Sequence, residues 1–94
     1  MPYVIVVYDI SSDKVRIAVC DKLKSMGFSM LQRSVYITRG GFSNAKDVAR
    51  AIQRYIDASR DSVLVVVVSR EVLERAIVIG VNRLIIDERG YAVI

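Results

Sequence analysis

Two apolar runs predict the central strands of a sheet. Residues 3–10 and residues 63–68 consist mainly of Val, Ile, Leu and Tyr, and neither run alternates between apolar and polar positions. Runs of this kind are typical of strands that are covered on both faces. We therefore expect the two strands to pair with each other, the first of them in the middle of the sheet.

Two helices are predicted by apolar residues that recur every three or four positions. The first begins at the Ser-Ser-Asp sequence of residues 11–13, which supplies N-cap chemistry, and ends at Gly27. The second begins at Asn44, which approximates a capping box with Asp47, and closes near Ser59. The apolar stripes are Val15, Ala18, Val19, Leu23 and Met26 in the first helix and Val48, Ala51, Ile52, Tyr55 and Ile56 in the second.

The segment between the helices, residues 28–39, reads as extended, with apolar and polar side chains on opposite sides. It is either one bent strand or a tight hairpin around Gln32–Arg33, and Gly40–Gly41 ends it. The C-terminal part predicts a short helical turn, a brief extended piece and a last strand, over residues 70–75, 76–79 and 83–86.

This order of elements predicts an α+β fold, a ferredoxin-like βαββαβ sandwich with an extra C-terminal strand, as a single domain over residues 1–94. Both helices then cover one face of the sheet. The other face leaves apolar residues such as Val6 and Val66 exposed, so we expect a homodimer with stacked sheets. The C-terminal segment, residues 70–94, is expected to complete the dimer, for example by pairing with the partner's sheet edge.

Composition narrows the possible functions. The chain is 53% hydrophobic and carries a formal charge of +4, which favours an anionic partner such as RNA or DNA. It contains no histidine and a single cysteine, Cys20, which excludes histidine-based nucleophile pairs, histidine-ligated metals and disulfides. The longest apolar run is far shorter than the roughly 20 residues that cross a bilayer. We expect a cytoplasmic protein without membrane contact.

Asp9 is the most informative polar residue, because a carboxylate that ends a buried strand is costly to dehydrate. One interpretation makes it a cap or turn acceptor for the helix that begins at Ser12. The other makes it a ligand of Mg²⁺ or Mn²⁺, since hard cations prefer oxygen ligands and keep several waters. A two-fold dimer would bring a second copy of Asp9 to the same point.

Other polar residues are candidates for contact with a phosphate group. Arg16 and Arg33 are candidates because one guanidinium group can donate two parallel hydrogen bonds to a phosphate. Each arginine is equally compatible with a solvated surface charge. Ser34 is a candidate for orienting a water molecule or a phosphate. Tyr8 and Tyr36 either stack on a ligand or, as is more usual for tyrosine, pack in the core or at an interface.

Three segments in this order, YVIVVYDISSDKVR, QRSVYI and ERAIVIG, resemble the CRISPR-associated protein 2 family of spacer-acquisition nucleases. The resemblance extends over almost the full length of the chain. The matching positions are Tyr8, Asp9, Ile10, Asp13, Lys14, Arg16, Gln32, Ser34, Val35 and Tyr36.

The resemblance implies a ferredoxin-like homodimer in which Asp9 of each subunit holds Mg²⁺ or Mn²⁺. It implies a metal-dependent endonuclease for single-stranded RNA or double-stranded DNA in antiviral defence, with CRISPR-associated protein 1, the integrase, as partner. Asp9, Tyr8, Arg16, Ser34 and Tyr36 match catalytic positions. Lys14 joins Arg16 and Arg33 as a candidate nucleic-acid contact.

The chain also differs from the family pattern. Val15, Ile17 and Ala18 stand where many members carry basic residues, and Met30 occupies a place that is often basic. Two alternatives therefore stay open. One is a non-catalytic DNA-binding bridge in the spacer-integration complex, and the other is a toxin-like ribonuclease of the same fold.

Overall fold

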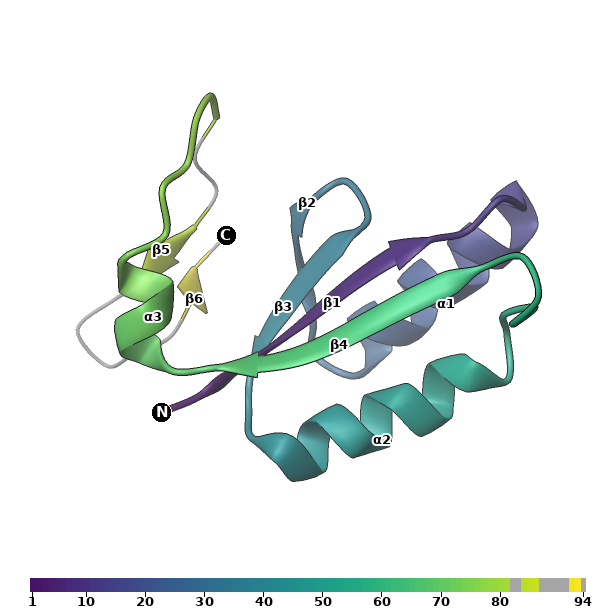
Figure 1. Cartoon of the computed structure of the whole chain (residues 1–94), viewed down its shortest axis with the longest axis horizontal. Helices are drawn as coiled ribbons and strands as arrows, with labels where there is room; N and C mark the ends of the chain where they lie inside the picture. Colours follow the sequence, from purple (N-terminus) through teal and green to yellow (C-terminus); the bar gives the residue numbers. More distant parts are fainter. Residues whose placement is uncertain (82–83, 87–91, 94) are drawn as a thin grey trace.

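The computed structural model describes residues 1–81, 84–86 and 92–93, and it shows an antiparallel sheet of four strands with two helices against one face (Figure 1). The strand order is β2-β3-β1-β4, which confirms the predicted ferredoxin-like α+β fold. Among these residues, no helix has both the length and the apolar character needed to cross a membrane. The elements are β1 (Tyr3–Asp9), α1 (Asp13–Ser25), β2 (Ser29–Gln32), β3 (Val35–Arg39), α2 (Phe42–Gln53), β4 (Ser62–Val68), α3 (Arg70–Glu74), β5 (Ile85–Ile86) and β6 (Ala92–Val93).

The first strand is central, as predicted, and β4 pairs with it. Strand β1 is antiparallel to both neighbours, with Val6 opposite Tyr36 on β3 and Val65 on β4. The pairing with β4 continues to the end of β1, where Asp9 lies opposite Ser62. Backbone hydrogen bonds on both edges therefore fix which face each β1 side chain occupies.

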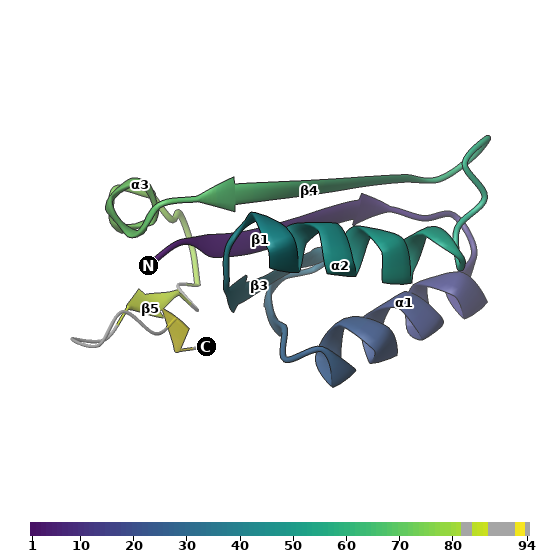
Figure 2. The same ribbon diagram turned by 90° about the horizontal axis from the view of Figure 1, so that it is seen from below.

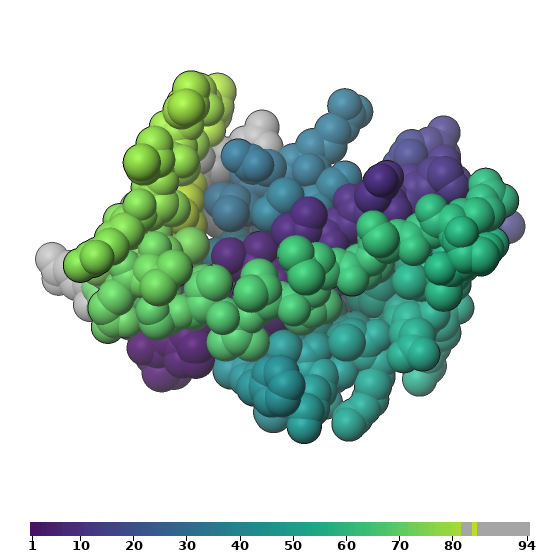
Figure 3. All heavy atoms as spheres, in the orientation of Figure 1, coloured from purple at the N-terminus to yellow at the C-terminus, as the bar shows by residue number. Residues whose placement is uncertain are grey.

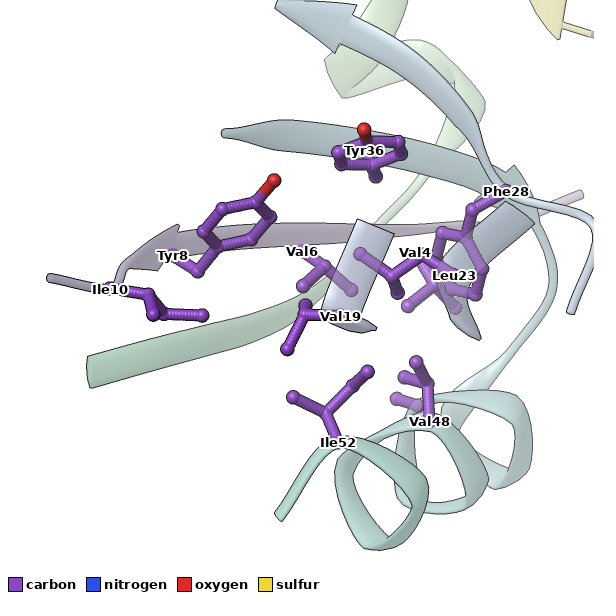
Figure 4. Close-up of a cluster of buried hydrophobic side chains, with 11 residues drawn as sticks. Val4, Val6, Tyr8, Ile10, Val19, Leu23, Phe28, Tyr36, Val48 and Ile52 are labelled. Atoms are coloured by element: carbon purple, nitrogen blue, oxygen red, sulfur yellow. The ribbon is translucent and has the colours of Figure 1, made fainter. Parts of the chain in front are cut away.

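Alternate residues of β1 form the core with the two helices. Figure 4 shows Val4, Val6 and Tyr8 on the side of the sheet where α1 and α2 pack. Figure 2 shows the two helices on that same side. The helices contribute buried residues from the predicted apolar stripes, namely Val19 and Leu23 from α1 and Val48 and Ile52 from α2.

The far face of the sheet is only partly covered, so the prediction that β1 is covered on both faces is wrong for this chain alone. Val7 of β1 is 36% exposed, and its neighbours Leu64 and Val66 on β4 are 61% and 38% exposed. Val66 therefore lies on the open face as expected. The expectation that Val6 is exposed was wrong, because its side chain points toward the helices and is fully buried.

Residues 28–39 form a hairpin rather than one bent strand. Gln32 pairs with Val35, which leaves Arg33 and Ser34 as a two-residue turn between β2 and β3. Ser34 has a φ of 64°, in the left-handed region that side-chain-bearing residues rarely adopt. Its carbonyl accepts a hydrogen bond of 3.1 Å from the backbone N–H of Tyr8, so the turn is tied to the end of β1.

The bounds of α2 differ from the prediction at both ends. The helix begins at Phe42 with Gly41 as its N-cap, and Asn44 reaches back to accept a hydrogen bond of 3.0 Å from the Gly41 N–H. Asn44 is thus the third residue of the helix, and its side chain caps the N-terminus, rather than Asn44 being the residue at which the helix begins. The helix ends at Gln53, and beyond it the Asp57 carboxylate accepts hydrogen bonds from both the backbone and the hydroxyl of Ser59, which favours a turn.

The C-terminal part partly follows the prediction. The helical turn predicted at residues 70–75 is present as α3, and β5 lies within the strand predicted at residues 83–86, of which residue 83 lies outside the described residues. Residues 76–79 form no strand. The extra strand β5 pairs with β6 in a separate two-stranded sheet rather than with the main sheet.

Tyr36 joins the sheet to α1 inside the core. Its ring is 2% exposed and lies stacked against Tyr8, with ring centroids 6.1 Å apart (Figure 4). Its hydroxyl lies 2.7 Å from the Sγ atom of Cys20 on α1. Burial, with the hydrogen bond to Cys20 as a second cause, raises the pKa of Tyr36 well above that of a free tyrosine.

The left-handed conformation of Ser34 yields a stability prediction. Replacing Ser34→Gly should raise the free energy of unfolding by about 1 kcal/mol, because glycine adopts this conformation without a steric penalty. The matched change is Gly27→Ala at the end of α1, where φ is 89° and a loss of about 1 kcal/mol is expected. Urea denaturation measures both. A destabilised Ser34→Gly variant would contradict the assigned turn geometry.

The raised pKa of Tyr36 yields a prediction about alkaline pH. The native protein retains a proton on Tyr36 that the unfolded chain releases above about pH 10, so stability should fall as the pH rises beyond that value. A Tyr36→Phe variant should lose less stability than the wild type between about pH 9 and about pH 11. Denaturant unfolding at the two pH values compares them. An equal loss in both proteins would show that Tyr36 does not contribute.

Candidate active site

A hollow of about 590 Å³ lies beyond the end of β1, between the first half of α1 and the β2–β3 turn. We call it the Asp9 hollow. It brings together five of the predicted site residues, whereas Lys14 and Tyr36 are not among the residues that line it. The lining residues are Tyr8, Asp9, Ile10, Arg16, Ile17, Cys20, Asp21, Met30, Arg33 and Ser34.

Asp9 presents an exposed carboxylate at the last position of β1. The cap interpretation of this residue is wrong, because α1 is capped by Ser12, whose hydroxyl accepts a hydrogen bond of 3.3 Å from the Val15 N–H. Within the part of the chain that the structure describes, no side chain or backbone group forms a hydrogen bond or ion pair with the carboxylate of Asp9. The carboxylate is therefore available to a ligand from outside the chain.

Arg16 lines the Asp9 hollow but already has partners. One terminal nitrogen, Nη1, donates a hydrogen bond of 3.0 Å to the carbonyl of Ile10, and the other forms an ion pair with Asp13. These contacts brace the connection between β1 and α1. The guanidinium has five N–H donors, so it retains capacity to bind a phosphate while it holds this connection.

Arg33 and Ser34 form the opposite wall of the Asp9 hollow. Arg33 is exposed, and Ser34 is partly buried in its left-handed conformation. Strained backbone of this kind is common at functional sites, where it persists because the surrounding structure holds it. Here the hydrogen bond from the Tyr8 N–H to the Ser34 carbonyl holds the turn beside Asp9.

The two predicted tyrosines lie in different surroundings. Tyr8 lines the hollow, whereas Tyr36 is buried behind it with its hydroxyl engaged by Cys20. Tyr36 thus supports the Tyr8 ring from the core side. Lys14 is exposed on the first turn of α1 and is not among the residues that line the hollow.

Sequence reasoning did not identify Cys20 and Asp21 as lining residues. They follow Arg16 and Ile17 by four positions on α1, so one helical turn places them on the same face of the helix. This four-residue spacing would have identified Cys20 and Asp21 as candidate lining residues once Arg16 was assigned to the site.

The chain supplies few ligands for a metal by itself. No group of three or more Cys, Asp or Glu side chains within residues 1–81 and the other described positions is arranged to hold a metal ion. Asp9 nevertheless has the right chemistry, because magnesium is bound through one or two carboxylates and otherwise keeps waters and phosphate oxygens. The donor set fits a cation that is shared with a second copy of Asp9.

Comparison with known proteins identifies the family. The family model of the CRISPR-associated protein Cas2 matches residues 1–76. A protein of Aeropyrum pernix named CRISPR-associated endoribonuclease Cas2 is 42% identical over 80 residues, which cover 85% of this chain and 87% of that protein.

Two further proteins extend the comparison. The crystal structure of a hypothetical protein from Thermus thermophilus superposes with a TM-score of 0.73 at 26% identity, covering 87% of this chain and 94% of that one. A CRISPR-associated endonuclease Cas1/endonuclease Cas2 fusion of Thermoproteus tenax is 31% identical over 75 residues, which cover 80% of this chain and 28% of the fusion. From the family match and the identity to these relatives, we conclude that the chain belongs to the CRISPR-associated protein Cas2 family.

Proposed function

We propose that this protein is a metal-dependent endonuclease that cleaves phosphodiester bonds of single-stranded RNA or double-stranded DNA in CRISPR spacer acquisition. The observation that carries the proposal is the exposed, unpartnered carboxylate of Asp9 in a hollow that also contains two arginines. Membership of the Cas2 family and the endoribonuclease name of the Aeropyrum relative support it.

The catalytic unit in this proposal is a homodimer. Asp9 lies on the same face of β1 as Val7, because side chains alternate along a strand. The exposed apolar residues Val7, Leu64 and Val66 lie on that face, so stacking it against a second copy would bury them and bring the two Asp9 carboxylates toward one another. Two carboxylates would then hold one Mg²⁺ or Mn²⁺.

The predicted site residues that line the Asp9 hollow each have a role in this proposal. When bound, the cation supplies a water of lowered pKa and balances negative charge on the phosphate. Arg33, which is exposed at the turn, binds the phosphate oxygens, and Arg16 keeps the connection after β1 in place while it donates to them. The Ser34 hydroxyl orients a water molecule or the phosphate. Tyr8 forms a wall of the hollow that limits where the sugar-phosphate backbone of the nucleic acid can enter.

The segment after α3 supplies a further part of the proposed dimer. Ile77, Ile79 and Val81 are 89%, 94% and 78% exposed. Figure 3 shows this lime-coloured segment projecting from the body of the molecule. Apolar side chains at every second position suit an extended segment that packs on another surface, which supports a role for residues 70–94 in completing the dimer.

Replacing Asp9 tests its proposed role as the metal ligand. The Asp9→Asn variant should lose metal-dependent cleavage of labelled RNA and duplex DNA by on the order of a hundredfold or more, because the amide cannot supply the charge that holds the cation. The matched control is Asp21→Asn, which removes a carboxylate from the same hollow but not from the proposed ligand pair. Undiminished cleavage by Asp9→Asn, or an equal loss in both variants, would exclude the assigned role.

A substitution on the open face of the sheet tests whether the dimer forms there. The Val66→Glu variant should be monomeric, with a dissociation constant at least about a hundredfold higher, because an unpaired charge would be buried between the sheets. Light scattering coupled to size-exclusion chromatography measures the mass. The control is Phe42→Glu, since Phe42 is 67% exposed on α2, which packs against the opposite face of the sheet. A Val66→Glu protein that stays dimeric would place the interface elsewhere.

A second function, that of a non-catalytic DNA-binding bridge for CRISPR-associated protein 1, is favoured by one specific observation. The Thermoproteus relative carries both proteins in a single chain, which suggests that the two act as one unit. In this case, spacer integration by the reconstituted complex would survive Asp9→Asn. Integration that requires Asp9 would favour the nuclease instead.

A further inference from the structure

The positive charge of the protein is not concentrated in the Asp9 hollow. The ionisable residues that line the hollow are the carboxylates of Asp9 and Asp21 and the guanidinium groups of Arg16 and Arg33, which balance formally. The chain as a whole is nevertheless +4, so its capacity to attract a polyanion lies on another surface.

The outer side of α2 is such a surface. Lys46, Arg50 and Arg54 follow one another at intervals of four residues, and all three are exposed, while Ala45, Val48 and Ile52 face the core. Residues at this spacing form a continuous ridge on a helix, and the three positions span about 12 Å along the axis. Asp47 lies beside this ridge, but its contact with Arg50 is 3.7 Å long and both side chains are exposed, so it neutralises little of the charge.

The same row continues to an exposed aromatic ring. Phe42 stands four residues before Lys46 and is 67% exposed, and the Lys46 ammonium lies over its ring, 4.9 Å from the centroid. An apolar ring at the first position of a helix gains nothing from solvent exposure. A cationic ridge beside an exposed aromatic ring is the combination with which proteins bind single-stranded nucleic acid, by contacting phosphates and stacking one base.

We propose that the row Phe42, Lys46, Arg50 and Arg54 is a binding surface for single-stranded nucleic acid, separate from the Asp9 hollow. One base stacks on Phe42, and the successive phosphates lie along the three cations. The row ends near the loop before β4, where the Asp61 carboxylate accepts a hydrogen bond of 3.2 Å from the N–H of Ser11, two residues after Asp9. A bound strand therefore leads toward the end of the sheet that carries Asp9.

The test measures binding without cleavage, so that its outcome is independent of the nuclease proposal. All proteins carry Asp9→Asn and are kept in EDTA, and the probe is a fluorescein-labelled single-stranded DNA oligonucleotide, compared with its own duplex. Fluorescence anisotropy gives the dissociation constant at several salt concentrations. The variants are Arg50→Gln with Arg54→Gln, Phe42→Ala, and, as the matched loss of two charges elsewhere, Lys22→Gln with Lys24→Gln on α1.

The double arginine variant should bind the single strand about tenfold more weakly, and the slope of log affinity against log salt should fall by about 1.4, or about 0.7 for each lost phosphate contact. Phe42→Ala should weaken single-strand binding by about tenfold and leave duplex binding and the salt slope unchanged. Phe42→Leu, which keeps an apolar side chain, should lose as much as Phe42→Ala, and thermal unfolding checks that each variant is folded.

Two outcomes would overturn the proposal. An equal loss of affinity in the α1 and α2 double variants would show that the charge acts diffusely and not through the row. Binding of duplex as tight as that of the single strand, with no effect of Phe42→Ala, would show that no base stacks on the ring.

Discussion

The alternation of side chains along β1 is the constraint on which the rest of the structure depends. Because β1 is hydrogen-bonded along both edges, its register is fixed, and Val4, Val6 and Tyr8 face the helices. A slip by one residue would exchange Val6 for Val7 and turn Asp9 toward the core. Burying that unpaired carboxylate would cost several kcal/mol, so Asp9 itself disfavours the wrong register.

The same strand organises the candidate site, because both walls of the Asp9 hollow are attached to its end. On one side the Ile10 carbonyl accepts the Arg16 hydrogen bond, and on the other side the Tyr8 N–H donates to the Ser34 carbonyl. The Tyr36–Cys20 contact then joins the neighbouring strand to α1 behind the hollow. The site is thus built on rigid elements, even though two of its residues belong to a strained turn.

Periodicity in the sequence was sufficient to predict the order of elements up to β4, the central position of β1 and the helix faces, because these depend mainly on burial. It misplaced Val6, since an unbroken apolar run does not show which alternate residues meet the helices. It also misplaced the ends of α2, where glycine capping and the Asp57–Ser59 turn compete with helix formation. The ends of the helix are set by local hydrogen bonds, and one hydrophobic pattern is compatible with several such hydrogen-bond arrangements.

At the candidate site, the sequence and the family resemblance pointed to five residues that do lie together, but not to the balance of their charges. Asp21 enters the hollow only through the helical turn that follows Ile17, and Arg16 is partly neutralised by Asp13. Both facts require the folded geometry. They also mean that the hollow alone has no excess positive charge with which to hold a phosphate.

A carboxylate that must approach a phosphate creates an electrostatic conflict, because like charges repel more strongly as water is excluded. In the proposed site, a cation between Asp9 and the phosphate would remove this repulsion at the point of chemistry, but it would not bring a long polyanion to the protein. The exposed cations of the proposed binding row on α2 would supply that attraction without entering the hollow. If attraction and chemistry are separated in this way, each surface can keep the charge that its role requires, and we expect binding to persist when the carboxylate is lost.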